Sequence, residues 1–207
     1  NYCFGAGIDH VDGDLEMSFV TIADNSAVAN GGQALGGGLS STFGFITANN
    51  TLFADNTPEN CDIYITPAST GYNLEDSDSC ELNTSTDQQN INDPKLGPLQ
   101  DNGGSLLTQA LLEDSPAIDR IPNGTNGCQA GVTTDARSAV RAGGDDRGDT
   151  ACDIGAYEYN SDQQPSAVAV TSVSITQNPD APLWLVGMAA LLAAGGLGWA
   201  VFRRRGG

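Results

Sequence analysis

The chain opens a loose repeat with Thr21-Ile22-Ala23-Asp24-Asn25-Ser26, which returns as Ile46-Thr47-Ala48-Asn49-Asn50-Thr51 and as Thr51-Leu52-Phe53-Ala54-Asp55-Asn56-Thr57. Each copy places β-branched, apolar or aromatic residues beside Asp or Asn, which is the pattern of a short strand that ends in a tight turn. Such runs predict short strands at residues 19–23, 43–47, 51–54 and 63–66.

The spacing of the copies indicates a solenoid. Ile46 follows Ile22 by 24 residues, the scale of one coil in proteins whose repeats bury a core only by stacking. Glycine clusters at 31–32 and 36–38 lie between the copies. We therefore expect an all-β protein, with residues 1–70 forming the last coils of a right-handed parallel β-helix. A β-sandwich with similar Asn-Ser turns is the alternative.

From residue 71 to residue 158 the repeat gives way to an ordered series of short motifs. It begins with Gly71-Tyr72-Asn73-Leu74 and Ser79-Cys80, and it closes with Cys152-Asp153-Ile154-Gly155-Ala156-Tyr157-Glu158. Asn102-Gly103 favours a tight turn with positive φ. Residues 108–112 fit a short helix or a strand, because apolar periodicity over so few residues does not separate the two.

This series, together with Asn60-Cys61, resembles the C-terminal region of bacterial right-handed β-helix surface proteins, the choice-of-anchor Q family. The resemblance covers roughly residues 17–159. The family's Asp-Gln-Arg-Gly and Arg-Pro correspond to Asp135-Ala136-Arg137-Ser138 and Arg141-Ala142, which keep the charged residues and replace Gln, Gly and Pro. The resemblance implies that residues 71–159 complete the β-helix as a β-rich cap, that an Asp–Arg pair forms, and that the attachment tail varies among members.

The cysteines indicate an oxidising compartment and structural disulfides. No pair among Cys3, Cys61, Cys80, Cys128 and Cys152 has CxxC spacing, and the chain has a single histidine. The sequence therefore offers few suitable ligands for a zinc site. Local pairing predicts the disulfides Cys61–Cys80 and Cys128–Cys152. Cys3 is left over, and we expect its partner upstream in a longer secreted protein.

The last part of the sequence predicts a membrane anchor. Residues 183–202, from Leu183 to Phe202, carry no charged side chain, and about 20 apolar residues span the ~30 Å hydrocarbon core as a helix. Trp184 and Trp199 lie near its two ends, where the membrane interface favours aromatic rings. The basic tail 203–207, with Arg203, Arg204 and Arg205, places that end in the cytoplasm. A cleaved sorting signal is the alternative to a retained helix.

The region before this anchor is strongly acidic. The formal net charge of the chain is −18, and all of its acidic residues precede Leu183. Nucleic acid is excluded as a partner, because such binding begins with Lys and Arg neutralising phosphates. Residues 160–182 are rich in Ser, Thr, Gln, Asp and Pro and predict a flexible spacer; a short docked strand there is the alternative.

No residue pattern supplies a catalytic site. The aspartates cluster at Asp9, Asp12 and Asp14, at Asp76 and Asp78, and at Asp145, Asp146 and Asp149. The first cluster approaches a calcium loop without matching it, and Asp is common in solvated turns. His10 could act as a general base, but a lone histidine is more often a turn or strand residue. We assign no catalytic, cofactor-binding or metal-binding residue, and calcium is the one cofactor considered.

These observations predict a non-enzymatic cell-surface protein for display, adhesion or envelope structure. It would be a single-pass membrane protein that contacts lipid through residues 183–202, with carbohydrate or another surface protein as candidate partners. The alternative is a surface-attached carbohydrate-active enzyme, a polysaccharide lyase or glycoside hydrolase, whose groove lies partly upstream. The discriminating observation is a carboxylate cluster with Arg or Lys on one strand face.

Overall fold

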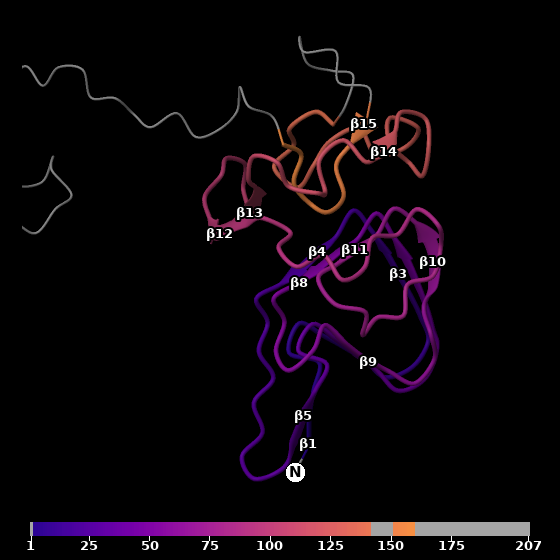
Figure 1. Ribbon diagram of the computed structural model, residues 1–207, viewed down its shortest axis with the longest axis vertical. Helices are drawn as coiled ribbons and strands as arrows, with labels where there is room; N and C mark the ends of the chain where they lie inside the picture. Colours follow the sequence, from indigo (N-terminus) through magenta and orange to yellow (C-terminus); the bar gives the residue numbers. More distant parts are fainter. Residues whose placement is uncertain (1, 142–150, 160–207) are drawn as a thin grey trace, which may run out of the picture. The chain divides into compact units, whose positions relative to one another are not determined.

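The computed structural model describes residues 2–141 and 151–159 (Figure 1). The chain divides into two units, and all of the described residues belong to the first, Asn1–Ser166. The described residues are all-β, with fifteen strands and no helix. Among them, no helix is long and apolar enough to cross a membrane. The expected spacer, membrane span and basic tail, and the cluster Asp145, Asp146 and Asp149, lie outside the described residues.

Three successive coils of the chain stack on one another (Figure 1). The first holds β1 (Tyr2–Phe4), β2 (Ile8–His10), β3 (Asp14–Ser18) and β4 (Thr21–Ala23). The second holds β5 (Gln33–Leu35), β6 (Leu39–Ser41), β7 (Phe45–Asn49) and β8 (Leu52–Ala54). The third holds β9 (Cys61–Ile63), β10 (Ala68–Gly71) and β11 (Leu74–Glu75).

Strands at the same place in successive coils pair in parallel. They form the three-stranded sheets β2-β6-β9, β3-β7-β10 and β4-β8-β11 and the two-stranded sheet β1-β5. This parallel pairing of successive coils fits a β-helix, whereas the sheets of a β-sandwich are antiparallel.

The expected 24-residue spacing of the repeat is wrong. Thr21–Ala23 pairs with Leu52–Ala54, so equivalent residues of the first two coils, such as Asn25 and Asn56, are 31 apart. The middle copy belongs to the neighbouring sheet, where Ile46 pairs with Leu15. From the second coil to the third the offset falls to 22, because the connection before β9 lacks a counterpart of β5. The copies look alike because their strands, although they belong to two different sheets, are each followed by Asn or Asp where the backbone turns.

Backbone corners explain why several strands begin later or end earlier than expected. Phe19, Asn50 and Tyr72 all have positive φ, at 55°, 51° and 56°, and each lies between a strand of β3-β7-β10 and a strand of β4-β8-β11. Asp24 and Asp55 repeat the feature after β4 and β8, at 58° and 54°. Asn and Asp tolerate this left-handed region better than other side chains, which accounts for their place at the ends of the copies.

The stacked coils have one core inside and a second on an outer face. Ile22 and Phe53 stack inside the coils with Met17, Leu39 and Ile46. β8 is buried on both faces, because Leu52 and Ala54 on its other side belong to the second core. A strand that is covered on both faces must be apolar throughout, as Leu-Phe-Ala is.

The residues that we expected to form one cap, 71–159, lie in two separate parts of the described structure. Cys80 and Leu82 join the inner core, and Gln88 forms a parallel bridge with Leu74, so residues 76–91 cover the end of the third coil. We call residues 94–141 and 151–159 the lateral module. Its antiparallel pairs are β12 (Leu96–Gln100) with β13 (Thr108–Leu111), and β14 (Ile121–Pro122) with β15 (Ala151–Cys152). Leu111, Ile121 and Ile154 pack with Leu52 and Leu74 on the outer face of β8 and β11.

Two of the predicted local features are confirmed. The disulfides Cys61–Cys80 and Cys128–Cys152 are formed, with Cα–Cα distances of 4.9 and 5.8 Å. Cys3 is a free cysteine, half-buried in β1. Gly103 has a φ of 94°, as the expected turn requires. Residues 108–112, for which the sequence left helix and strand open, contain the strand β13.

Candidate functional site

Two of the three aspartate clusters noted in the sequence lie among the described residues, and neither forms a metal site there. Asp9, Asp12 and Asp14 are exposed on the first coil, and the Asp12 carboxylate accepts a hydrogen bond from Gly13 N at 2.8 Å. Asp76 is held by the fold, because its oxygens accept from Asp55 N and from Asn60 Nδ2, both at 2.6 Å. Within residues 2–141 and 151–159, no group of three His, Cys, Asp or Glu is placed to hold a metal ion.

A different set of carboxylates is aligned by the coil register. Asp24, Asp55 and Asp76 follow β4, β8 and β11 in successive coils. Burial raises the pKa of Asp55, and the negative charges of Asp76, Asp24 and Asp93 raise it further. The Gln109 side chain of the lateral module donates to Asp24 at 2.6 Å. Sequence reasoning missed this row because it grouped Asp76 with Asp78. The three aspartates are 31 and 21 residues apart, and only the stacking of the coils brings them together.

A fully buried carboxylate ends the inner apolar stack. Glu75 pairs in register with Phe53, which pairs with Ile22. One oxygen of Glu75 accepts from the hydroxyls of Ser77 and Ser79, both at 2.8 Å, and both oxygens accept from Cys80 N. Buried polar groups cost free energy unless they are hydrogen-bonded, so these donors make Glu75 part of the fold rather than a ligand group.

A second carboxylate, Asp87, organises the covered end of the coils. It accepts from Ser69 and Thr84 hydroxyls, both at 2.6 Å, and from Asn73 N at 3.0 Å. Partial burial raises the pKa of Asp87, but the hydrogen bonds from Ser69, Thr84 and Asn73 outweigh it, so the pKa lies below its usual value.

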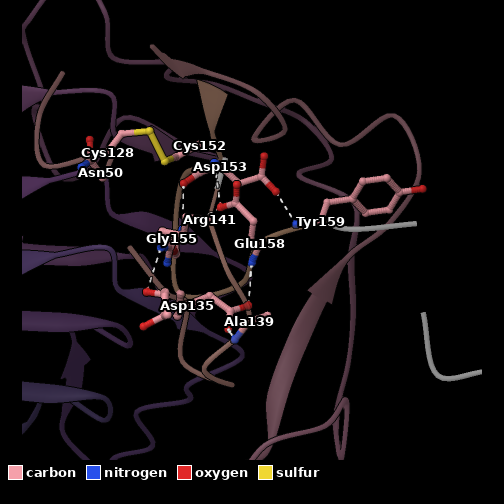
Figure 2. Close-up of polar contacts among 12 residues, drawn as sticks. Asn50, Cys128, Asp135, Ala139, Arg141, Cys152, Asp153, Gly155, Glu158 and Tyr159 are labelled. Atoms are coloured by element: carbon pink, nitrogen blue, oxygen red, sulfur yellow. Dashed lines mark hydrogen bonds and ion pairs between the residues drawn. A yellow bond between two sulfur atoms is a disulfide. The ribbon is translucent and has the colours of Figure 1, made fainter. Parts of the chain in front are cut away.

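The lateral module contains a cluster of buried ions. The buried side chains of the cluster are those of Asp135, Arg137, Arg141, Asp153 and Glu158. Figure 2 shows Asp153 next to the Cys128–Cys152 disulfide and Asp135 at the other end of the group, beside Ala139. Arg137 pairs with Asp135 at 2.7 Å, and Arg141 pairs with Glu158 at 2.9 Å. The Asp–Arg pair implied by the family resemblance is therefore present, whereas the Arg141–Glu158 pair had no sequence signal.

Arg141 joins this cluster to the outer face of the coils. Its guanidinium lies 4.2 Å from the centre of the Phe19 ring and donates to Gly155 O at 2.9 Å. The backbone NH of Gly155 in turn donates to Asn50 O at 2.9 Å. Burial lowers the pKa of Arg141, while the nearby carboxylate of Glu158 opposes that shift. Arginine stays protonated in proteins, so Arg141 acts as a fixed cation between two parts of the fold.

Asp153 is the least compensated carboxyl of the cluster. Burial and the charge of Glu158 raise its pKa well above the usual value, although backbone NH groups of Asp119 and Tyr159 donate to its two oxygens. Both oxygens are occupied by backbone donors, so this raised pKa belongs to a structural carboxyl rather than to an acid that faces a ligand.

His10 is fixed within the coil stack. Its Nδ1 lies 3.0 Å from Ser41 Oγ in the neighbouring coil, and its Nε2 is buried without a hydrogen-bond partner among the described residues. A general base needs a nitrogen within hydrogen-bond reach of substrate. His10 therefore has no nitrogen that faces a substrate, since Nδ1 is held by Ser41 and Nε2 is buried.

A group of exposed apolar side chains lies on the surface of the described coils. We call Val11, Phe43, Phe45, Tyr64 and Ile65 the exposed corner, because they lie where the strands β2, β6 and β9 turn toward β3, β7 and β10. The exposed fractions of Phe43, Phe45 and Tyr64 are 57%, 72% and 81%. Single exposed apolar residues are ordinary, but a cluster that includes three aromatic rings marks an interaction site.

No protein-family model, no curated protein and no solved structure matches this chain. The site must therefore be interpreted from its own residues.

Proposed function

We propose that this chain is a non-enzymatic surface module for adhesion or display, built as a right-handed parallel β-helix and anchored by residues 183–202. The observation that supports an adhesive role most directly is the contrast between its charged and its aromatic side chains. Glu75, Asp87 and the ions of the lateral module are used by the fold. Phe43 and Phe45 on the second coil and Tyr64 on the third stand exposed.

The attachment part of the proposal rests on sequence. The uncharged run 183–202 followed by Arg203, Arg204 and Arg205 favours a single span whose acidic N-terminal side faces outward. The resemblance to choice-of-anchor Q proteins supports surface attachment in general, because the attachment tail varies among members. A net charge of −18 also favours a solvated, outward-facing module over one that lies on anionic lipid.

The attachment is tested by expressing the chain behind a bacterial signal peptide and comparing it with a variant that ends at residue 182. We expect the full chain in the membrane fraction, with its N-terminal part recognised by an antibody added outside intact cells. The shortened variant should be released from the membrane fraction. Equal membrane retention of both forms would contradict an anchor at residues 183–202.

The adhesive role is tested by binding of the purified full chain, held in detergent micelles, to polysaccharides and to cell surfaces. Saturable binding without any turnover of the bound polymer is expected. Hydrolysis or elimination of any polysaccharide would show a carbohydrate-active enzyme instead. Absence of binding to every surface would leave a purely envelope-structural role.

A further inference from the structure

The exposed corner is a regular part of the coil stack rather than a loose loop. Phe43 N donates to Val11 O at 3.1 Å, Phe45 N donates to Gly13 O at 2.8 Å, and Tyr64 N donates to Ser41 O at 3.1 Å. These bonds link the corners of three successive coils, which parallel pairing spaces about 4.8 Å apart. Phe43 and Phe45 therefore lie on the second coil and Tyr64 on the third, so two adjacent coils present the three rings.

Gly44 fixes the two phenylalanines of the second coil. It has a φ of +87°, and a Cβ at this position would lie 2.2 Å from Gly13 O, so only glycine lets the two coils approach so closely here. Phe43 and Phe45 flank this glycine on a backbone that is hydrogen-bonded to the coil below. Their rings are thus carried by a rigid support, which lowers the entropy that a ligand must overcome.

The surroundings of the rings are polar and acidic. Asp14 pairs in register with Phe45, and Asp12 lies at the equivalent corner of the first coil. Both carboxylates are exposed, as are the hydroxyl-bearing residues Thr42 and Thr66. The corner therefore offers flat apolar faces edged by hydrogen-bond acceptors.

We infer that the exposed corner binds a neutral polysaccharide through Phe43, Phe45 and Tyr64. This inference rests on the proposed adhesive role and names its ligand class. One face of a pyranose ring presents several C–H groups, which carry slight positive charge and stack on the electron-rich face of an aromatic ring. The hydroxyls at the edge of the sugar can donate to the carboxylates of Asp12 and Asp14.

Shape and charge favour this ligand over other classes. Rings on two adjacent coils offer stacking faces to more than one sugar unit of a linear polymer. The carboxylates of Asp12 and Asp14, on a chain with net charge −18, repel acidic polysaccharides. A protein partner would have to supply desolvated pockets for these rings, and the test below separates that outcome from binding of a polymer.

The test uses the full chain in detergent micelles and pull-down on insoluble cellulose, chitin and amylose, with soluble polygalacturonate as the acidic probe. Phe45→Ala and Tyr64→Ala should each weaken binding to the preferred neutral polymer roughly tenfold, the scale of a lost aromatic anchor. Tyr64→Phe should keep most of the binding, because the ring face is retained. Leu106→Ala and Val28→Ala remove exposed apolar side chains elsewhere, with exposed fractions of 62% and 73%, and should leave binding unchanged.

The outcomes separate this inference from the adhesive role. Binding of a neutral polymer by the wild type with no change in Phe45→Ala and Tyr64→Ala would overturn the corner as the site and leave adhesion standing. Binding to a protein surface that these variants weaken, without binding to any polymer, would overturn the ligand class. Preference for polygalacturonate would overturn the charge argument. Unchanged thermal unfolding of the variants excludes a folding defect as the cause of lost binding.

Discussion

The stacked coils and the lateral module are stabilised in different ways, although both belong to one all-β unit. The coils repeat one strand arrangement, so apolar side chains such as Ile22 and Phe53 lie on one another and backbone bonds continue from coil to coil. The lateral module has only two-stranded sheets, and it adds a disulfide and buried ions to its apolar contacts. Stacked repeats bury a continuous apolar core against their neighbours. An irregular segment has a smaller core and depends in addition on a disulfide and ion pairs.

The largest expected effect tests whether the ions hold the lateral module. Arg141→Ala should lower the free energy of unfolding by about 3–5 kcal/mol, because Glu158 and Asp153 would remain buried without their cation. Urea unfolding measures the loss. Lys95→Ala is the matched control, since its pair with Asp114 is exposed and 3.8 Å apart, and should change stability by less than about 1 kcal/mol. Equal effects of the two substitutions would remove the distinction between the regions.

The two disulfides provide a second, somewhat smaller test. They close loops of similar length, with sequence separations of 19 and 24 residues. Each should therefore add about 2–4 kcal/mol to the free energy of unfolding, because it restricts the unfolded chain. Hydrogen exchange on Cys61→Ser/Cys80→Ser should show opening of residues 76–91 with β7 and β8 still protected. The variant Cys128→Ser/Cys152→Ser should instead lose protection at β14 and β15. Loss of protection throughout both variants would show one cooperative unit without regional differences.

The smallest expected effects are pH-dependent and opposite in sign. Asp87 has a lowered pKa in the folded state. Its contribution to stability is therefore complete at pH values above its pKa in the unfolded chain, and it is lost as pH falls through its pKa in the folded state. Asp55 has a raised pKa in the folded state. The native state is therefore most stable at pH values below the pKa of Asp55 in the unfolded chain, and it loses stability as pH rises through the pKa in the folded state. At pH 7, Asp87→Asn should therefore be less stable than the wild type and Asp55→Asn more stable.

Unfolding curves from pH 3 to pH 7 provide the measurement. The difference between each variant and the wild type should shrink toward acid, because the carboxyl of the wild type becomes neutral there. Two variants that shift stability in the same direction at pH 7 would contradict the assigned surroundings of Asp87 and Asp55.

Some features were predictable because their causes are local in sequence. The Asn and Asp residues that close the repeats mark corners with positive φ, and Asn102-Gly103 marks a turn. Short cysteine spacings indicated both disulfides. The strand register was not predictable, because a 31-residue coil and a 22-residue coil differ only in the length of one connection. Guessing the period from Ile22 and Ile46 placed them in one sheet, although they belong to neighbouring sheets.

The sequence by itself determined the all-β class, the cysteine pairs and an acidic chain with a single candidate membrane span, since these depend on composition and short spacings. Only the tertiary structure decided which side chains lie together. It aligned Asp24 with Asp55, buried Arg141 against Glu158, and left Phe45 and Tyr64 exposed on neighbouring corners. The reason is physical: parallel coils join residues that are distant in sequence, and burial depends on what each coil meets after it has turned.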